Sequence, residues 1–183
     1  ARMAFTVTAT GGLALFAGIL LIGITLGTFS LSEVAERAPE LLASPLAVPA
    51  MILIMLGAFT KSAQLPFHFW LPQAMEAPAP ASAFLHSATM VKAGVFLVAA
   101  FSPGLSGSST WQLPLIVLGL VSLLMAGWRA LRETDLKLVL AFGTVSQLGF
   151  LLVLVGIGTR DTMLAGLTML LAHSLFKSAL FMA

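Results

Sequence analysis

Two long apolar segments, each with one lysine inside it, constrain this chain more than any other feature. They cover residues 46–71 and 81–101, and the proline-rich connection 72–80 joins them. Lys61 lies about midway along the first segment, and Lys92 lies close to the centre of the second. An unpaired lysine at the centre of a membrane helix costs about 2.5–3.5 kcal/mol on the insertion scale, so such residues are rare and usually serve transport. The two lysines therefore indicate a membrane protein with a transport role.

The composition also favours a membrane protein. Of the 183 residues, 59% are hydrophobic and 9% are charged, whereas soluble domains carry about 25% charged residues. The net charge of +2 is too small a basic excess to indicate nucleic-acid binding. There is no cysteine, which excludes disulfides and thiolate metal sites within these residues. Nucleotide-binding loops and the common zinc-protease and serine-hydrolase motifs are absent too, so we expect no catalytic residue, no cofactor and no metal site.

Six segments are long and apolar enough to span a bilayer, which takes roughly 20 residues. They cover residues 4–29, 46–71, 81–101, 111–130, 138–157 and 162–183. Pro66 should break the second segment, because proline lacks a backbone donor and clashes with the preceding turn. The sequence thus predicts an all-α polytopic membrane protein with about six transmembrane helices, one of them broken, forming a single domain over residues 1–183. Because the chain opens without methionine and stops inside an apolar segment, we expect it to be part of a longer protein.

The connections between these segments are predicted to be irregular, and their charges predict an orientation. Residues 30–45 read as a loop, and residues 72–80 contain too many prolines for a helix. Basic residues in short loops favour the cytoplasmic side. One side would carry Arg2, Arg129, Arg132 and Lys137, and the other Arg37 and Arg160. This asymmetry puts the first side, together with the connection 72–80, in the cytoplasm.

Lys61 and Lys92 are the first candidates for proton transfer. Lys61 precedes Pro66 by five residues, and a helix break near a buried charge frees carbonyls and makes room for water. The alternative for Lys61 is that its long side chain reaches the membrane interface. Near Lys92, His86 lies six residues earlier, about 120° away around an ideal helix, so the two do not form one stripe. His86 could relay protons or simply pack and hydrogen-bond.

His173 and Lys177 form a second candidate pair. They are four residues apart and share a helix face, with Ser174 and Ser178 next to them. Two titratable groups without an evident third ligand favour a proton relay over a metal site. Lys137, at the start of segment 138–157, reads on local grounds as a cytoplasmic charge that fixes the orientation.

Polar and aromatic residues elsewhere allow more than one interpretation. Trp111 and Trp128 lie at the two ends of segment 111–130, where interfacial anchors are common. Thr144, Ser146 and Gln147 either hold water or form hydrogen bonds between helices.

Three stretches resemble one family of membrane proteins. GAFTKSAQLPFHFWLPQAMEAPAPASAFLHSATMVKAG at residues 57–94 resembles the signature of antiporter-like proton-translocating subunits. DLKLVLAFGTVSQLGF at 135–150 and HSLFKSALF at 173–181 resemble later segments of that family. The family includes the largest subunit of Mrp-type multisubunit cation/proton antiporters and the distal membrane subunit of respiratory complex I. PFHFWLP together with HSATMVKAG is more similar to the Mrp large subunit, because the complex I homologue usually lacks a lysine at the position of Lys92.

The resemblance implies a fold of two inverted five-helix repeats, each with a broken helix. The chain would hold the last three helices of the first repeat and the first three of the second. By position, the resemblance implies a proton relay through Lys61, Lys92, His86, Lys137, His173 and Lys177. For Lys137 this overrules the local interpretation. The acidic partner of Lys61 would lie upstream of Ala1, and the second broken helix beyond Ala183.

We therefore expect a proton-translocating membrane subunit of a multisubunit monovalent cation (Na⁺)/proton antiporter, which makes the chain part of a transporter and not an enzyme. Its partners would be other antiporter subunits, H⁺ and Na⁺, and the lipid bilayer, in the cell membrane of a bacterium or archaeon. One alternative is a proton-pumping subunit of NADH–quinone oxidoreductase (complex I) or of a hydrogenase-linked relative, which would be part of a translocase. The other is a structural scaffold, in which the lysines only pair with acidic residues of adjacent helices.

Overall fold

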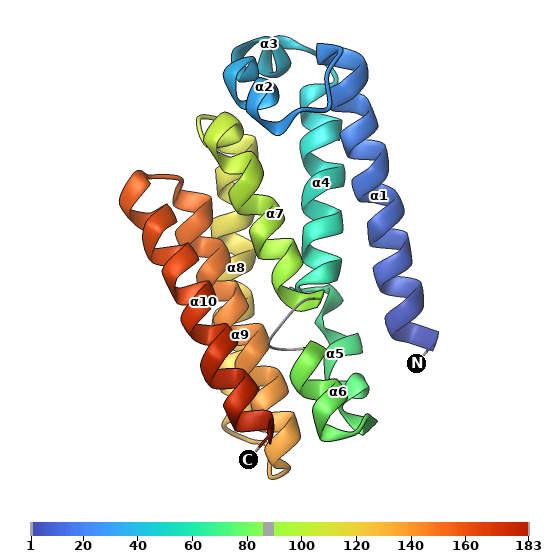
Figure 1. Ribbon diagram of the computed structural model, residues 1–183, viewed down its shortest axis with the longest axis vertical. Coiled ribbons are helices and arrows are strands. Elements are labelled where there is room, and N and C mark those ends of the chain that lie inside the picture. Colours follow the sequence, from blue (N-terminus) through green and yellow to red (C-terminus); the bar gives the residue numbers. More distant parts are fainter. Residues whose placement is uncertain (1, 86–89, 183) are drawn as a thin grey trace.

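The computed structural model describes residues 2–85 and 90–182. His86, one of the expected relay residues, lies outside the described residues. Long helices run up and down one common axis, and short helices close both ends of the bundle (Figure 1). Every regular element in the described ranges is a helix, so the predicted all-α membrane fold is confirmed.

Six longer helices build the bundle. They are α1 (Arg2–Leu26), α4 (Ala47–Lys61), α7 (Met90–Leu105), α8 (Ser109–Ala130), α9 (Leu136–Ile157) and α10 (Arg160–Met182). Among the described residues, α1, α8, α9 and α10 are long and apolar enough to cross a membrane, whereas α4 and α7 are shorter apolar helices. The 15 residues of α4 extend about 22 Å at 1.5 Å per residue, less than the roughly 30 Å of a bilayer core. The predicted crossing by residues 46–71 therefore requires the segment after α4 as well.

The break in the second apolar segment starts earlier than the sequence predicts. α4 ends at Lys61 instead of continuing to Pro66. Ala63 has a positive φ of 48°, which an L-residue rarely adopts and which no α-helix can contain. The chain then resumes as the 3₁₀ turn η1 (Phe67–Phe69). Lys61 is thus the last residue of a helix and does not lie in the middle of a continuous one.

Both stretches expected to be irregular contain short helices. These are α2 (Leu31–Glu36), α3 (Ala38–Ala43), α5 (Trp70–Gln73), the 3₁₀ turn η2 (Ala74–Glu76) and α6 (Ala79–Ala83). α3 and α6 each carry a proline among their first two residues. Proline is tolerated there because those backbone N–H groups have no acceptor within the helix. A proline-rich composition therefore did not exclude helix in these connections.

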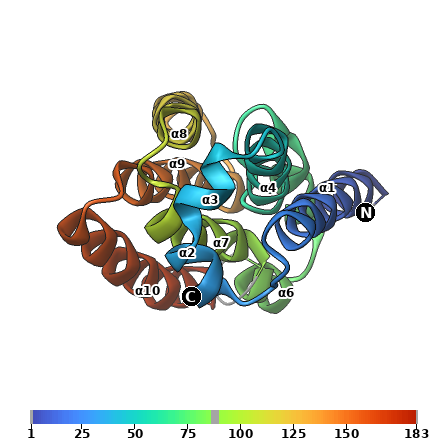
Figure 2. The same ribbon diagram turned by 90° about the horizontal axis from the view of Figure 1, so that it is seen from above.

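The helices pack in pairs around α7 (Figure 2). α1 packs against α4, and α8 packs against α9. α7 lies between the pairs and contacts both α4 and α9, while α10 covers α9 on its outer side. The N-terminus, the α5–α6 connection and the α8–α9 turn lie at one end of the bundle, and α2 and α3 cap the other (Figure 1). The predicted grouping of these connections at one end is therefore seen, whereas their place in the cytoplasm stays a prediction.

Two glycines bring α8 and α9 into backbone contact. A Cβ atom added to Gly119 would lie 2.9 Å from the carbonyl oxygen of Gly149, and one added to Gly149 would lie 2.6 Å from the carbonyl oxygen of Gly119. Ser146 Oγ also donates to the Leu123 carbonyl at 2.8 Å. Of the two roles open to Ser146, the structure therefore shows the hydrogen bond between helices.

Trp111 does not act as an interfacial anchor. Its side chain is fully buried, and its indole Nε1–H donates to Ser102 Oγ at 3.3 Å. Ser102 lies near the end of α7, which extends to Leu105, and this places a buried acceptor within reach of Trp111. Trp128, by contrast, is 61% exposed, as expected for an interfacial residue.

Candidate functional site

Three titratable side chains meet between α7, α9 and α10. Lys92 is 4% exposed, His173 is fully buried, and Lys177 is 6% exposed. Burying such groups is costly unless each finds a partner. Their surroundings therefore decide what the cluster can do.

Lys92 links α7 to α10. Its Nζ donates to Ser174 Oγ at 2.7 Å, and Ser174 Oγ donates in turn to the Leu170 carbonyl at 2.8 Å. The lysine and the serine are 82 residues apart in sequence. The contact thus joins the two halves of the chain through a charged hydrogen bond.

Lys177 links α10 to α9. Its Nζ donates to the Leu140 carbonyl at 3.0 Å. The hydroxyl of Thr144 donates to the same carbonyl at 2.8 Å. Gly143 faces the ammonium, since a Cβ added there would lie 3.4 Å from Nζ. The lysine thus binds the backbone of α9 at a place where small side chains leave room.

His173 lies on the same buried side of α10 as Lys177, as their spacing predicts. Its ring packs edge-on against Phe176, with 5.1 Å between the ring centroids. Neither ring nitrogen has a hydrogen-bond partner among the residues that the structure describes. Lys177 follows one turn later on the same buried side of α10, and Lys92 reaches Ser174, the residue next to His173. The imidazole is therefore a buried group near two lysines, and its ring nitrogens have no partner within the described residues.

Lys137 lies one turn before the carbonyl that binds Lys177. Asp135 caps the start of α9, because its Oδ1 accepts from the backbone N–H of Lys137 at 2.8 Å and of Leu138 at 3.3 Å. The side chain of Lys137 donates to the Ala77 carbonyl at 3.1 Å, in the connection between η2 and α6. Lys137 is half-buried, so it lies where the row of buried groups approaches the bundle end.

Lys61 lies apart from this cluster. It is half-buried in an open cavity of about 500 Å³, between α1 and α7, and none of the described lining residues is acidic. Besides Lys61, the lining consists of Leu15, Met90, Ala93, Gly94 and Leu97. At 100° per residue, these α7 positions lie roughly opposite Lys92. The structure therefore brings Lys92, His173 and Lys177 together, while α7 stands between them and Lys61.

The break after Lys61 holds a buried polar residue that the sequence analysis missed. Gln64 is fully buried; its Nε2 donates to the Ser62 carbonyl at 2.9 Å and to the Val145 carbonyl at 3.4 Å. Its Oε1 has no partner among the described residues. The backbone N–H of Leu65 donates to Ser122 Oγ at 3.0 Å. The sequence feature that could have pointed to Gln64 is its position between a lysine and a proline within an apolar segment.

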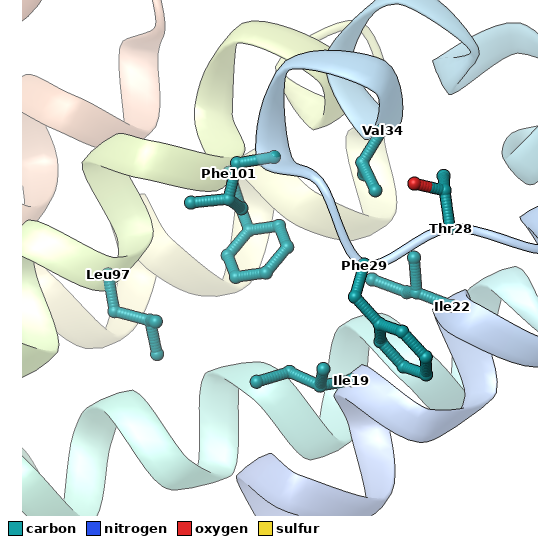
Figure 3. A pocket seen from close by; sticks show the side chains of 8 residues that line it. Ile19, Ile22, Thr28, Phe29, Val34, Leu97 and Phe101 are labelled. Atoms are coloured by element: carbon teal, nitrogen blue, oxygen red, sulfur yellow. The ribbon is translucent and has the colours of Figure 1, made fainter.

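The pocket in Figure 3 is of a different kind. It has a volume of about 240 Å³ and lies between α1, α2 and α7, toward the end capped by α2 and α3. Its lining is almost wholly apolar, with Phe29 and Phe101 as the largest side chains. Because no lining side chain is titratable, it does not continue the lysine row. No group of three or more His, Asp or Glu side chains that could hold a metal ion occurs in the described ranges.

Within the described residues, long apolar helices, an interrupted helix and buried lysines define a polytopic membrane protein. Residues 1–183 all match the family described as "NADH:quinone oxidoreductase/Mrp antiporter, TM", and the chain belongs to that family.

Curated relatives of the chain are components of antiporters. It is 46% identical over 183 residues to the probable A/B subunit of a K(+)/H(+) antiporter of Rhizobium meliloti (strain 1021), covering 100% of the chain and 18% of the relative. It is 45% identical over 196 residues to the A subunit of a Na(+)/H(+) antiporter of Alkalihalophilus pseudofirmus, covering 100% of the chain and 24% of the relative. The chain thus spans about a fifth to a quarter of the length of these relatives.

Solved structures match the fold as well. A chain of the Mrp complex from Dietzia sp. DQ12-45-1b superposes with a TM-score of 0.94 at 44% identity, over 99% of this chain and 20% of that one. A chain of the membrane-bound sulfane sulfur reductase, an archaeal respiratory membrane complex, gives a TM-score of 0.83 at 23% identity, over 97% and 37% of the two chains. The second likeness concerns the fold alone. The predicted resemblance to the large subunit of Mrp-type antiporters is confirmed.

Proposed function

We propose that this chain is the proton-conducting part of the large subunit of a Mrp-type monovalent cation/proton antiporter. It would work in the cell membrane of a bacterium or archaeon together with the other subunits of the complex. The names of the curated relatives support exchange of Na⁺ or K⁺ for H⁺. The likeness to a chain of a Mrp complex supports assembly with other subunits.

The observation that carries the proposal is the buried cluster of Lys92, His173 and Lys177. Each lysine reaches a neighbouring helix, through Ser174 in one case and the Leu140 carbonyl in the other. Like charges in an interior of low dielectric constant repel one another strongly. Protonation of one group therefore disfavours protonation of the next, and a proton arriving at one end promotes release at the other.

The two outer lysines would extend the row in opposite directions. Lys137 lies one turn from the α9 carbonyl that binds Lys177, and water would bridge the remaining gap. Lys61 opens into its own cavity at the end of α4, where an acidic side chain from outside the described chain would be its partner. His86 is the further member that the family resemblance implies.

The test uses the full-length subunit in its assembled complex, in everted vesicles from cells that lack other antiporters. A fluorescent amine reports the pH gradient, and NaCl or KCl is added to collapse it. We expect Lys177→Ala to abolish the cation-dependent signal while the complex still assembles on native gels. Lys61→Ala should behave in the same way. Arg160→Ala removes an exposed cation at the start of the same helix α10 and should transport like the wild type.

Normal antiport by an assembled Lys177→Ala complex would refute the relay and favour a scaffold, in which the lysines contribute only to stability. A redox-driven pump is the other alternative. In that case the vesicles would move protons on addition of an electron donor and would not respond to NaCl or KCl.

A further inference from the structure

The side chain of Ser174 has two hydrogen bonds of fixed direction. It accepts from Lys92 Nζ at 2.7 Å and donates its only proton to the Leu170 carbonyl at 2.8 Å. Nothing in the proposed relay requires a hydroxyl at this position, because Ser174 does not titrate in the physiological range. Ser174 nevertheless lies between the buried ammonium of Lys92 and the backbone of α10, and it is a contact through which α10 holds Lys92.

We propose that Ser174 is a positioning residue that holds Lys92 against α10 both before and after the lysine gives up its proton. The inference rests on the proposed function, since it assumes that Lys92 changes its charge during transport. It assigns to Ser174 a role that local helix packing alone would not require.

The chemistry of a hydroxyl explains how one residue can serve both charge states. A hydroxyl is one donor and two acceptor lone pairs on a freely rotating bond. Toward an ammonium it accepts, as in the structure. Toward a neutral amine it can turn its proton from the Leu170 carbonyl to the lysine nitrogen and donate instead. The Leu170 carbonyl keeps its helical partner, the backbone N–H of Ser174, so the reversal leaves no backbone group unpaired.

This reversal keeps the lysine nitrogen in place during the cycle. Without the hydroxyl, Lys92 would lose this contact with α10, and the distance from its nitrogen to His173 on the same helix would be less tightly fixed. Proton transfer requires hydrogen-bond reach, directly or through one water. A fixed nitrogen therefore favours a high maximal rate, with little effect on cation affinity.

The alternative is a purely structural serine. Hydroxyls inside helices commonly donate to the carbonyl four residues earlier, as Ser174 does, without any functional role. Ser178 provides the matched control, because it lies one turn further along α10, is half-buried, and makes no side-chain hydrogen bond within the described ranges.

The experiment compares Ser174→Ala, Ser174→Thr and Ser178→Ala in the assembled complex with its full-length large subunit, with Lys177→Ala as the reference for the relay. The initial antiport rate is measured in everted vesicles over a range of cation concentrations. A hydrogen bond to a charged group is worth enough for a loss of about tenfold or more. We expect Ser174→Ala to lose that much of the maximal rate at an unchanged half-saturating cation concentration. Ser174→Thr, which keeps the hydroxyl, should recover most of the rate, and Ser178→Ala should match the wild type.

Each other outcome overturns the inference. Wild-type rates in Ser174→Ala would mean that Lys92 needs no hydroxyl. Equal losses in Ser174→Ala and Ser174→Thr, or in Ser178→Ala, would make the effect one of packing. Failure of the proposed function is recognised separately, because Lys177→Ala would then transport normally whatever the serine variants do.

Discussion

Gly94 is the point at which α7 touches the end of α4, and replacing it with alanine tests the packing described above. An added Cβ would lie 2.5 Å from Ser62 Oγ, 3.1 Å from the carbonyl carbon of Ala58, and closer still to that carbonyl's oxygen. The carbonyl belongs to the last turn of α4 and cannot rotate away as a flexible side chain could. We therefore expect Gly94→Ala to push α7 away from α4.

The size of the effect follows from the geometry. Real Cβ atoms essentially never come within 3.0 Å of such neighbours, so α7 must move by about half an ångström or more. Because Lys92 lies on the opposite side of α7, the movement presses Lys92 toward Ser174. The Lys92 Nζ and Ser174 Oγ atoms are already only 2.7 Å apart. Overpacking of this kind costs about 1–3 kcal/mol, and the gain in helix propensity offsets about 1 kcal/mol of it. A net loss of roughly 0–2 kcal/mol remains.

The matched control is Gly12→Ala in α1. No heavy atom of the described chain lies within 4 Å of a Cβ at that position, so the substitution should be neutral or should stabilise by up to about 1 kcal/mol. Both variants are assayed as purified complexes by the temperature at which half of the complex aggregates, and in vesicles by antiport rate. The aggregation temperature of the Gly94→Ala complex should lie several degrees below that of Gly12→Ala. Its antiport rate should also be lower. Equal stability and equal rates in the two variants would refute the reasoning.

Two further predictions concern the ends of helices. Asp135→Ala removes the cap of α9, which should cost about 1 kcal/mol and speed amide hydrogen exchange in the first turn of that helix. Asp135→Asn keeps a capping oxygen and should keep the protection. Equal exchange in the two variants would contradict this role. Trp70→Phe removes the indole donor that lies 3.1 Å from the Thr60 carbonyl. Leaving this buried carbonyl without its donor should cost about 1–3 kcal/mol, and an unchanged midpoint of heat-induced aggregation would count against it.

The helical part of the fold was largely readable from the sequence. Length and apolarity predicted segments 111–130 and 138–157, and the helices at Ser109–Ala130 and Leu136–Ile157 differ from them by at most two residues at either end. The onset of the break could not be read in this way. It depends on the positive φ of Ala63, and alanine has no intrinsic preference for that conformation.

The site was readable only where it is local. The spacing of His173 and Lys177 placed both on one buried side of α10, because a helix has a fixed period. One partner of Lys92 is a residue 82 positions away, and a partner of Lys137 is 60 positions away. Such partners depend on how the helices pack, which no local pattern records. Ser174 therefore appeared in the sequence only as a neighbour of the titratable pair.

The glycine contact between α8 and α9 also limits which parts of the molecule can move. Two helices whose backbones touch at Gly119 and Gly149 cannot slide past one another without driving a carbonyl into a Cα atom. We therefore expect α8 and α9 to move together as one unit. Ser122 on α8 anchors the broken segment, and the Leu140 carbonyl on α9 anchors Lys177. The broken segment and Lys177 are therefore both tied to the same closely packed pair of helices.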